Sequence, residues 1–237
     1  MILVRNCPHN NGIHTLIHEE QSLVLKSSYS NEAIIRLKHE HSGYDWYFSQ
    51  TNMSNNWYLN YFENSSGMYS RLSVGLFYGS AGECYKNISY NRKNILRVIN
   101  YYKDVWPSSS KKSLPIHGDF SLGNIIFSKK SLAIIDWEHF KIGAAPWGFD
   151  LVNLFYEAIF FSFNNAGNLT KNDKETFLEL RKVMIFTLIQ GESFNCSLDA
   201  LTNFIEKNSS IWGVFKSKLP VMNFSKAQRD LILELEK

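Results

Sequence analysis

Long apolar runs and a recognisable export signal are both missing from this sequence of 237 residues. The longest nearly unbroken apolar run, residues 154–163, contains a glutamate and is too short to cross a bilayer. The first ten residues show no basic head followed by a long apolar stretch, so no secretory signal is visible. These absences argue against a membrane-spanning or exported chain, and we expect a cytoplasmic protein without a transmembrane segment.

Cysteine and concentrated charge are also scarce. The three cysteines, Cys7, Cys84 and Cys196, are widely spread and offer no paired spacing. They are typical of free thiols in a reducing compartment, and they exclude a disulfide framework or a cysteine-based zinc site. The 25 basic and 22 acidic residues are interspersed and leave a net charge of +3. A nucleic-acid-binding protein normally concentrates its basic residues on one face, so we expect no nucleic-acid partner.

What the sequence does contain is a change of pattern along its length. With 44% hydrophobic residues, a chain of this size forms one domain or two closely joined lobes. Strand-like runs surround one helical stretch in the first third, with strands expected at residues 13–18, 22–26, 57–62 and 69–76 and the helix at 31–47. Further on, helices are expected at residues 88–106, 148–163, 174–190, 197–207 and 226–236.

The pattern predicts an α+β fold of two lobes. Three glycines, Gly75, Gly79 and Gly82, cluster where the strand-like composition gives way to the helical one. We therefore expect a small N-terminal lobe of residues 1–78 and a mainly helical C-terminal lobe of residues 79–237. Ser225 and Gln228 form a capping-box pattern ahead of the last expected helix.

The most informative segment is residues 114–138, which read LPIHGDFSLGNIIFSKKSLAIIDWE. Its apolar runs at residues 125–127 and 132–135 flank a short polar turn, a pattern that predicts a β-hairpin. Asn124 stands just before the first strand and Asp136 just after the second, so both side chains reach the same open end of the hairpin.

Asp119 lies five residues before Asn124, on a glycine-containing loop, and completes this group. Two carboxylates and one amide oxygen are hard ligands that suit Mg²⁺. Phosphoryl transfer uses such a metal site together with a carboxylate that orients and deprotonates the acceptor hydroxyl. The spacing His-x-Asp-x4-Asn from His117, followed by Asp136 after a hairpin, matches the catalytic and metal loops of the kinase-like fold. The alternative is an ordinary hairpin whose polar ends cap a helix and form a turn.

Taken together, HGDFSLGN, IDWE and GFDLVNLF resemble the aminoglycoside phosphotransferase and choline kinase superfamily. The resemblance is strong over about residues 114–157, faint over residues 13–82 and essentially absent in the C-terminal helices. It implies a two-lobed protein-kinase-like fold with a reduced, β-rich N-terminal lobe.

The resemblance also implies roles for the residues of the central segment. Asp119 would be the catalytic base, and Asn124 and Asp136 would be the Mg²⁺ ligands. His117 and Asp150 would support the site structurally, since the aspartate of a GFD element braces the catalytic loop in this superfamily.

A kinase of this type also needs a lysine that holds phosphates and an acid that orients the lysine. Lys26 ends a strand in the pattern that the superfamily shows, and the following helix offers Glu32 and Glu40. We favour Glu40 because its spacing from Lys26 is the closer match; the alternative is that Lys26 and Glu40 are solvated surface charges.

The front of the chain departs from the protein-kinase pattern because it has no Gly-x-Gly-x-x-Gly loop. Residues 8–12, PHNNG, are expected to meet the phosphates through backbone amides instead. We also expect the lobe to be short, with a strand missing. Residues 74–80 are the expected hinge, where Phe77 and Gly79 would meet the adenine of ATP.

The acceptor is expected to be a small molecule. Only 13 residues separate Asp136 from Asp150, which leaves no room for a peptide-binding segment, and Ser121 stands where protein kinases carry a lysine. Glu138, Trp137 and Trp147 would suit a quaternary ammonium group or an amino sugar through ionic and cation–π contacts. Aromatic residues in this region are also typical of a packed core, and a sugar acceptor remains open.

The sequence thus predicts an ATP- and Mg²⁺-dependent phosphotransferase that moves the γ-phosphate to a hydroxyl group of a small molecule or glycan. One alternative is specifically a choline or ethanolamine kinase, because GFDLVN resembles the GFD-x-x-N of those enzymes. The other alternative is a catalytically silent nucleotide-binding pseudokinase that acts as a scaffold.

Overall fold

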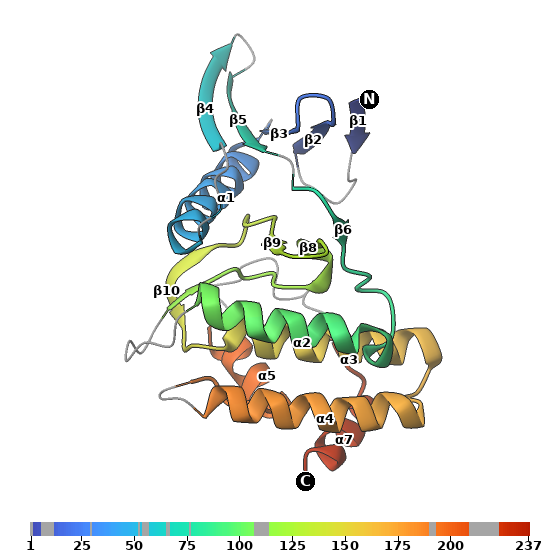
Figure 1. Cartoon of the computed structure of the whole chain (residues 1–237). Coiled ribbons are helices and arrows are strands. Elements are labelled where there is room, and N and C mark those ends of the chain that lie inside the picture. The colour runs from blue at the N-terminus through green and yellow to red at the C-terminus, as the bar shows by residue number, and fades with distance from the viewer. Residues whose placement is uncertain are drawn as a thin grey trace.

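The computed structural model describes residues 2–5, 12–28, 30–51, 53, 57–64, 67–75, 77–106, 114–189, 193–208 and 223–237. A sheet and helix α1 lie at the end of the molecule that carries the N-terminus, and helices α2, α3, α4, α5 and α7 lie at the other end, where the chain finishes (Figure 1). Small sheets that include strands β8 and β9 lie between them. The fold is therefore α+β, with a β-rich N-terminal part and a mainly helical C-terminal part, as predicted.

The N-terminal sheet is antiparallel and has the strand order β1-β2-β3-β5-β4. Its strands are β1 (Ile2–Arg5), β2 (Ile13–His18), β3 (Leu23–Ser28), β4 (Trp57–Asn64) and β5 (Gly67–Gly75). The expectation of a missing strand is wrong, because the short apolar run at residues 2–4 pairs with β2 as an edge strand. In this sheet Lys26 lies on β3 between Thr15 of β2 and Leu72 of β5.

Helix α1 (Asn31–Gln50) contacts strands β3, β4 and β5 of this sheet. It begins at Ser30, whose hydroxyl accepts a hydrogen bond from the backbone N–H of Ala33 at 3.2 Å, so one of the unpaired donors of the first turn is satisfied. The buried face of the helix carries Ala33, Ile34 and Leu37, and Tyr44 and Tyr47 extend it into the core. The helix ends three residues later than predicted.

The C-terminal part contains helices α2 (Ile88–Val105), α3 (Phe149–Ala166), α4 (Lys171–Leu188), α5 (Leu198–Lys207) and α7 (Lys226–Leu235). The predicted capping box of Ser225 and Gln228 is confirmed ahead of α7. Helix α4 begins three residues earlier than predicted because Thr170 and Asp173 form a second capping box. Helix α2 packs against both α3 and α4.

The predicted hairpin is confirmed as strands β8 (Ile125–Phe127) and β9 (Leu132–Ile134), which pair antiparallel. Strand β6 (Ser80–Ala81) joins the outer edge of β8. A separate pair, β7 (Leu114–Ile116) and β10 (Lys141–Ala145), brackets the segment that contains the hairpin. The boundary expected between residues 78 and 79 falls just before β6 and stays a prediction. No helix among the described residues is both long and apolar enough to cross a membrane.

Candidate active site

The hairpin brings Asp119 and Asn124 together at its open end. Asn124 is the last residue of a short 3-10 helix (Leu122–Asn124) that leads into β8, and the N–H of Ile135 donates to its backbone carbonyl at 3.0 Å. The side-chain Nδ2 of Asn124 donates to the backbone carbonyl of Asp119 at 2.8 Å and to its Oδ2 at 3.0 Å. With Nδ2 committed to Asp119, the Oδ1 atom of Asn124 is the part of the amide suited to a cation.

Asp136 follows β9 and lies in a second polar group with Lys26 and Glu40. The ammonium of Lys26 donates to both carboxylate oxygens of Glu40, at 2.8 and 2.9 Å, and it also contacts Oδ1 of Asp136. Glu40 is completely buried, whereas Glu32 is exposed. The structure therefore joins Lys26 to the acid that the sequence favoured.

The charged groups of Lys26, Glu40 and Asp136 strongly shift one another's pKa values. Burial alone would lower the pKa of Lys26, but the carboxylates of Asp136 and Glu40 outweigh burial and raise it well above its ordinary value. Burial raises the pKa of Glu40 to about 7 despite the nearby lysine. Burial would also raise the pKa of Asp136, but Lys26 outweighs it and holds that pKa below its ordinary value. Asp136 is thus kept anionic, which suits a metal ligand.

Asp119 has a different environment. Burial raises the pKa of its carboxyl group above the ordinary value, and the charge of Asp136 adds to this effect. The hydrogen bond from Asn124 and the nearby His139 act in the opposite direction. A raised pKa increases the basicity of the carboxylate, which suits a group that must accept a proton.

His117 and Asp150 hold the loop that carries Asp119. Asp150 accepts hydrogen bonds from the backbone N–H of His117 at 2.9 Å and of Gly118 at 3.3 Å. The ring of His117 is buried between two backbone groups: Nε2 lies 2.9 Å from the carbonyl of Ile135, and Nδ1 lies 3.3 Å from the N–H of Asp119. A carbonyl only accepts and an N–H only donates, so the ring is neutral with its proton on Nε2. Burial lowers the pKa of His117 to about 4, in agreement with this tautomer.

Gly118 lets this loop approach the segment that follows Asp136. Its φ of +84° is in the left-handed region, and a Cβ at this position would lie 2.5 Å from the carbonyl oxygen of His139. A side chain does not fit there, so glycine is required on both counts. The loop of Asp119 and the segment of Asp136 are therefore in direct backbone contact.

The two tryptophans expected to bind the acceptor lie in the packed core. Trp137 is completely buried and packs against aromatic neighbours that include Trp46, Tyr47 and Trp106. Trp147 is 4% exposed and donates its indole N–H to the backbone carbonyl of Trp106. A fully packed indole has no face to offer a ligand, so this placement argues against acceptor contact and corrects the expectation for both tryptophans.

Glu138 is also committed within the protein. Its carboxylate lies 3.2 Å from Nη2 of Arg36 on α1 and 3.2 Å from Nε2 of the neighbouring His139. Only 9% of the residue is exposed. This environment corrects the expectation that Glu138 would meet an acceptor cation.

The residues expected to bind the adenine lie near the hairpin. Phe77 is partly buried and stacks on Phe48 of α1, with ring centroids 6.1 Å apart. Gly79 is exposed and lies close to the backbone of Phe127 at the end of β8. Their contact with a nucleotide stays a prediction. Of the loop at residues 8–12 expected to meet the phosphates, residues 8–11 lie outside the described residues, as does Cys7.

Glu157 and Cys84 lie close enough to Asp119 for its charge to affect their pKa values, and the sequence pattern indicated neither as a site residue. Burial raises the pKa of Glu157 on α3 well above its ordinary value, and the charge of Asp119 adds to the effect. Burial likewise raises the pKa of the Cys84 thiol, to which Glu157 and Asp119 contribute. Cys84 and Cys196 are free thiols, as expected. The signal for Glu157 was available, since it follows Asp150 by seven residues and so shares its face of a helix.

The donor set fits a magnesium ion that also binds phosphate. Within the described part of the chain, no group of three or more His, Cys, Asp and Glu side chains forms a metal cage. Mg²⁺ in nucleotide sites does not need one, because it takes one or two protein ligands together with phosphate and water oxygens. The anionic carboxylate of Asp136 and the Oδ1 of Asn124, at the same end of the hairpin, meet this requirement.

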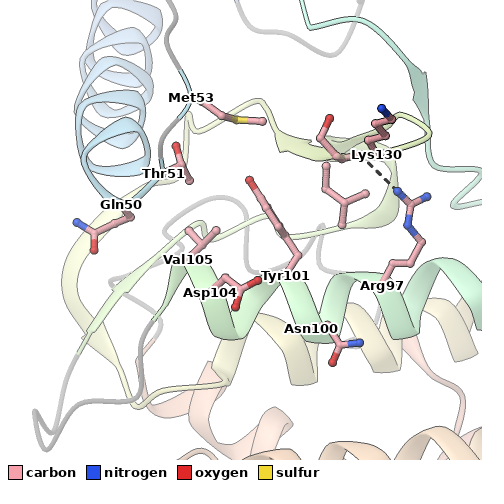
Figure 2. A pocket seen from close by; sticks show the side chains of 11 residues that line it. Gln50, Thr51, Met53, Arg97, Asn100, Tyr101, Asp104, Val105 and Lys130 are labelled. Carbon is pink, nitrogen blue, oxygen red and sulfur yellow. Dashed lines mark hydrogen bonds between the residues drawn. The ribbon is translucent and has the colours of Figure 1, made fainter.

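A cavity of about 720 Å³ lies at the opposite, turn end of the hairpin. Figure 2 shows side chains from the end of α1, from α2 and from the hairpin turn around it, among them Gln50, Tyr101 and Lys130. Arg97 from α2 reaches the turn and donates to the carbonyl of Ser128 at 2.8 Å. Neither Asp119 nor Asp136 lines this cavity, so it is not part of the candidate active site.

Comparison with known proteins gives a family match over part of the chain and a fold. Residues 80–169, which contain Asp119, Asn124, Asp136 and Asp150, match the model of the phosphotransferase enzyme family. A search of curated proteins finds no match to the chain.

Two solved structures illustrate the fold. A mutant of aminoglycoside 2′-phosphotransferase-IIIa in complex with GDP is 13% identical, and the match covers 100% of this chain and 90% of that one with a TM-score of 0.52. Amicoumacin kinase hAmiN in complex with AMP-PNP, Ca²⁺ and Ami is 11% identical, with 99% and 86% covered and a TM-score of 0.52. At these identities the likeness shows the kinase-like fold alone. Together with the family match, it confirms the resemblance to the aminoglycoside phosphotransferase and choline kinase superfamily.

Proposed function

We propose that this protein is an ATP- and Mg²⁺-dependent phosphotransferase that moves the γ-phosphate of ATP to a hydroxyl group of a small molecule. The observation that carries the proposal is the meeting of two polar groups at one end of the β8–β9 hairpin: Asp119 with Asn124, and Lys26 with Glu40 and Asp136. The match of residues 80–169 to the phosphotransferase enzyme family supports it.

The nucleotide would be held by residues of both polar groups. Asn124 and Asp136 would hold Mg²⁺, which when bound neutralises part of the charge of the triphosphate. Lys26 would bind phosphate oxygens, and Glu40 fixes the direction of its ammonium group through two hydrogen bonds. Nucleotides are also present in the two solved structures that resemble this fold.

Asp119 would act on the acceptor. Its carboxylate accepts the proton of the acceptor hydroxyl, while the hydroxyl oxygen forms a bond to the γ-phosphorus. The bond between the γ-phosphorus and the oxygen bridging to the β-phosphate breaks, and ADP leaves with that oxygen. The hydrogen bond from Asn124 to Oδ2 at 3.0 Å orients the carboxylate, and burial keeps the carboxylate basic.

Glu157 favours an acceptor that carries an amine. The carboxyl group of Glu157 lies close enough to Asp119 for the charge of Asp119 to raise its pKa. A positively charged amino group on the acceptor, as on an amino sugar or ethanolamine, would favour the ionised form of Glu157 and pair with it. Burial of Trp137 and Trp147 removes the aromatic contacts that would have favoured a quaternary ammonium group, so a choline-specific kinase has less support.

The decisive experiment measures ADP formation with a panel of acceptors: choline, ethanolamine, aminoglycosides and simple sugars. We expect Mg²⁺-dependent ADP release with at least one amine-bearing acceptor. Binding of Mg²⁺ and a non-hydrolysable ATP analogue without turnover of any acceptor would favour the silent scaffold. Failure to bind nucleotide at all would reject both readings.

A further inference from the structure

One face of helix α1 contacts three consecutive residues that begin with the proposed metal ligand. Arg36 pairs with Glu138, Glu40 reaches Asp136 through the shared ammonium of Lys26, and Gly43 lies against Trp137. The three α1 positions are separated by four and three residues, so they share one stripe of the helix.

The closest of these contacts leaves no room for movement between helix and segment. A Cβ at Gly43 would lie 2.4 Å from Cβ of Trp137, which means that the helix backbone rests directly on this residue. The backbone of α1 at Gly43 is therefore packed directly against the side chain of Trp137.

Arg36 supplies the polar end of this contact. Its Nη2 lies 3.3 Å from Oε1 and 3.2 Å from Oε2 of Glu138, and the two residues are only 5% and 9% exposed. Nε2 of His139 approaches Oε1 of the same carboxylate at 3.2 Å. Removing one partner of a buried ion pair leaves an uncompensated charge, so such a pair resists separation.

The backbone of this segment is strained at Asp136, the proposed metal ligand. Asp136 has a φ of +65°, one of two non-glycine residues with positive φ in the described part of the chain. Such a conformation persists only where the surrounding structure enforces it. Contacts on Trp137 and Glu138, the next two residues, are well placed to do so.

We propose that Arg36 is a positioning residue: by pairing with Glu138 it docks α1 on residues 136–139 and holds the carboxylate of Asp136 in its metal-binding position. The proposal rests on the function proposed above, because it concerns the arrangement of the Mg²⁺–nucleotide site. It gives Glu138 a role in the contact between α1 and residues 136–139 instead of a role in acceptor binding. Since His139 rests against Gly118, the same contact also supports the loop of Asp119.

The test compares Arg36→Met with the wild type and with a matched control, Arg92→Met. Arg92 also pairs with a glutamate, Glu179, through Nε at 2.7 Å, but that pair is exposed and joins α2 to α4. Binding of AMP-PNP is measured by titration calorimetry in the presence of Mg²⁺ and again in EDTA. Hydrogen exchange of the ligand-free proteins is followed in α1 and in residues 136–140.

We expect Arg36→Met to weaken Mg²⁺-dependent AMP-PNP binding at least tenfold, with little change in EDTA, and to speed exchange in both segments. A merely structural defect would weaken binding equally under both conditions. Arg36→Lys keeps the charge but not the planar guanidinium group and should fall between wild type and Arg36→Met. Arg92→Met should match the wild type in every measurement.

Mg²⁺-dependent binding by Arg36→Met within twofold of the wild type would overturn the inference while leaving the proposed function intact. If the wild type itself shows no Mg²⁺-dependent binding, the proposed function fails. In that case the exchange data still test the inference. If Arg36→Met leaves hydrogen exchange in α1 and residues 136–140 unchanged, docking of α1 by Arg36 is also rejected. If exchange becomes faster, docking by Arg36 is supported and only its connection to metal binding is rejected. Arg36→Lys keeps the test valid should Arg36→Met fail to fold.

Discussion

Lys26 Nζ donates to both oxygens of Glu40 and contacts Asp136, which follows it by 110 residues in the chain. This one ammonium group joins strand β3, helix α1 and the end of the β8–β9 hairpin. Because both carboxylates depend on it, the part of the site that would hold phosphate and metal is a coupled unit. Separate contributions of its members to binding are therefore not additive.

Asp136→Ala should abolish the Mg²⁺ dependence of nucleotide binding. The substitution removes the carboxylate that Lys26 keeps anionic, and the alanine offers no oxygen to a cation. A thermal-shift titration with AMP-PNP, with and without Mg²⁺, checks this. The wild type should be stabilised further when Mg²⁺ is added, and the variant should not. An equal Mg²⁺ effect in the two proteins would remove Asp136 from the metal site.

Asp119→Asn should lower turnover by roughly 10² to 10⁴ while leaving AMP-PNP binding unchanged. The amide cannot accept the acceptor proton, but its oxygen can still accept the hydrogen bond from Asn124, so the loop keeps its geometry. ADP formation with the best acceptor of the panel is the measurement, and the AMP-PNP titration is the control. Turnover within a few-fold of wild type contradicts the role of Asp119 as the base.

Acid should destabilise the protein through His117. The pKa of this buried imidazole is about 4 in the folded protein, against about 6.5 when unfolded. The neutral ring therefore contributes stability that is present above pH 6.5 and is lost as the pH falls toward 4, by up to roughly 3 kcal/mol. Protonation of Nδ1 would also break its hydrogen bond with the N–H of Asp119.

Urea unfolding of the wild type and of His117→Asn at pH 7.5 and 4.5 isolates this contribution. Burial raises the pKa values of Glu40 and Asp150 to about 7, so protonation of these acids stabilises the folded protein as the pH falls through part of the same range. Both acids titrate in both proteins, so their effect cancels in the comparison. The stability advantage of the wild type over His117→Asn should shrink at pH 4.5. An advantage that is equal at both pH values would contradict a buried neutral histidine.

Gly43→Ala should destabilise the protein even though alanine is the better helix former. The gain in helix propensity is about 1 kcal/mol, whereas forcing extra volume into a packed contact costs about 1–3 kcal/mol. The contact here is severe, because Cβ of Trp137 is attached to the backbone and cannot rotate away. The melting temperature should fall for Gly43→Ala and stay nearly unchanged for Ser42→Ala, at an exposed position of the same helix. A higher melting temperature for Gly43→Ala would show that α1 does not rest on Trp137.

Much of the site follows from local spacing. The hairpin places Asn124 and Asp136 at one end because antiparallel strands of equal length return the chain to its starting point. The five-residue separation of Asp119 and Asn124 lets a single loop bring them together. The capping box before α7 is likewise local, since its two residues lie within one turn.

The sequence by itself determined the hairpin, the helices and the identity of the acids at the end of the hairpin, because these depend on periodicity and on neighbours within a few residues. Only the tertiary structure decided that Trp137 is core, that Glu138 faces Arg36 and that the charge of Asp119 raises the pKa of Glu157. Arg36 and Glu138 are 102 residues apart. Spacing sets the direction of a side chain within its own element, but which elements meet is settled by packing over the whole chain. That packing buried the residues that were expected at the acceptor site.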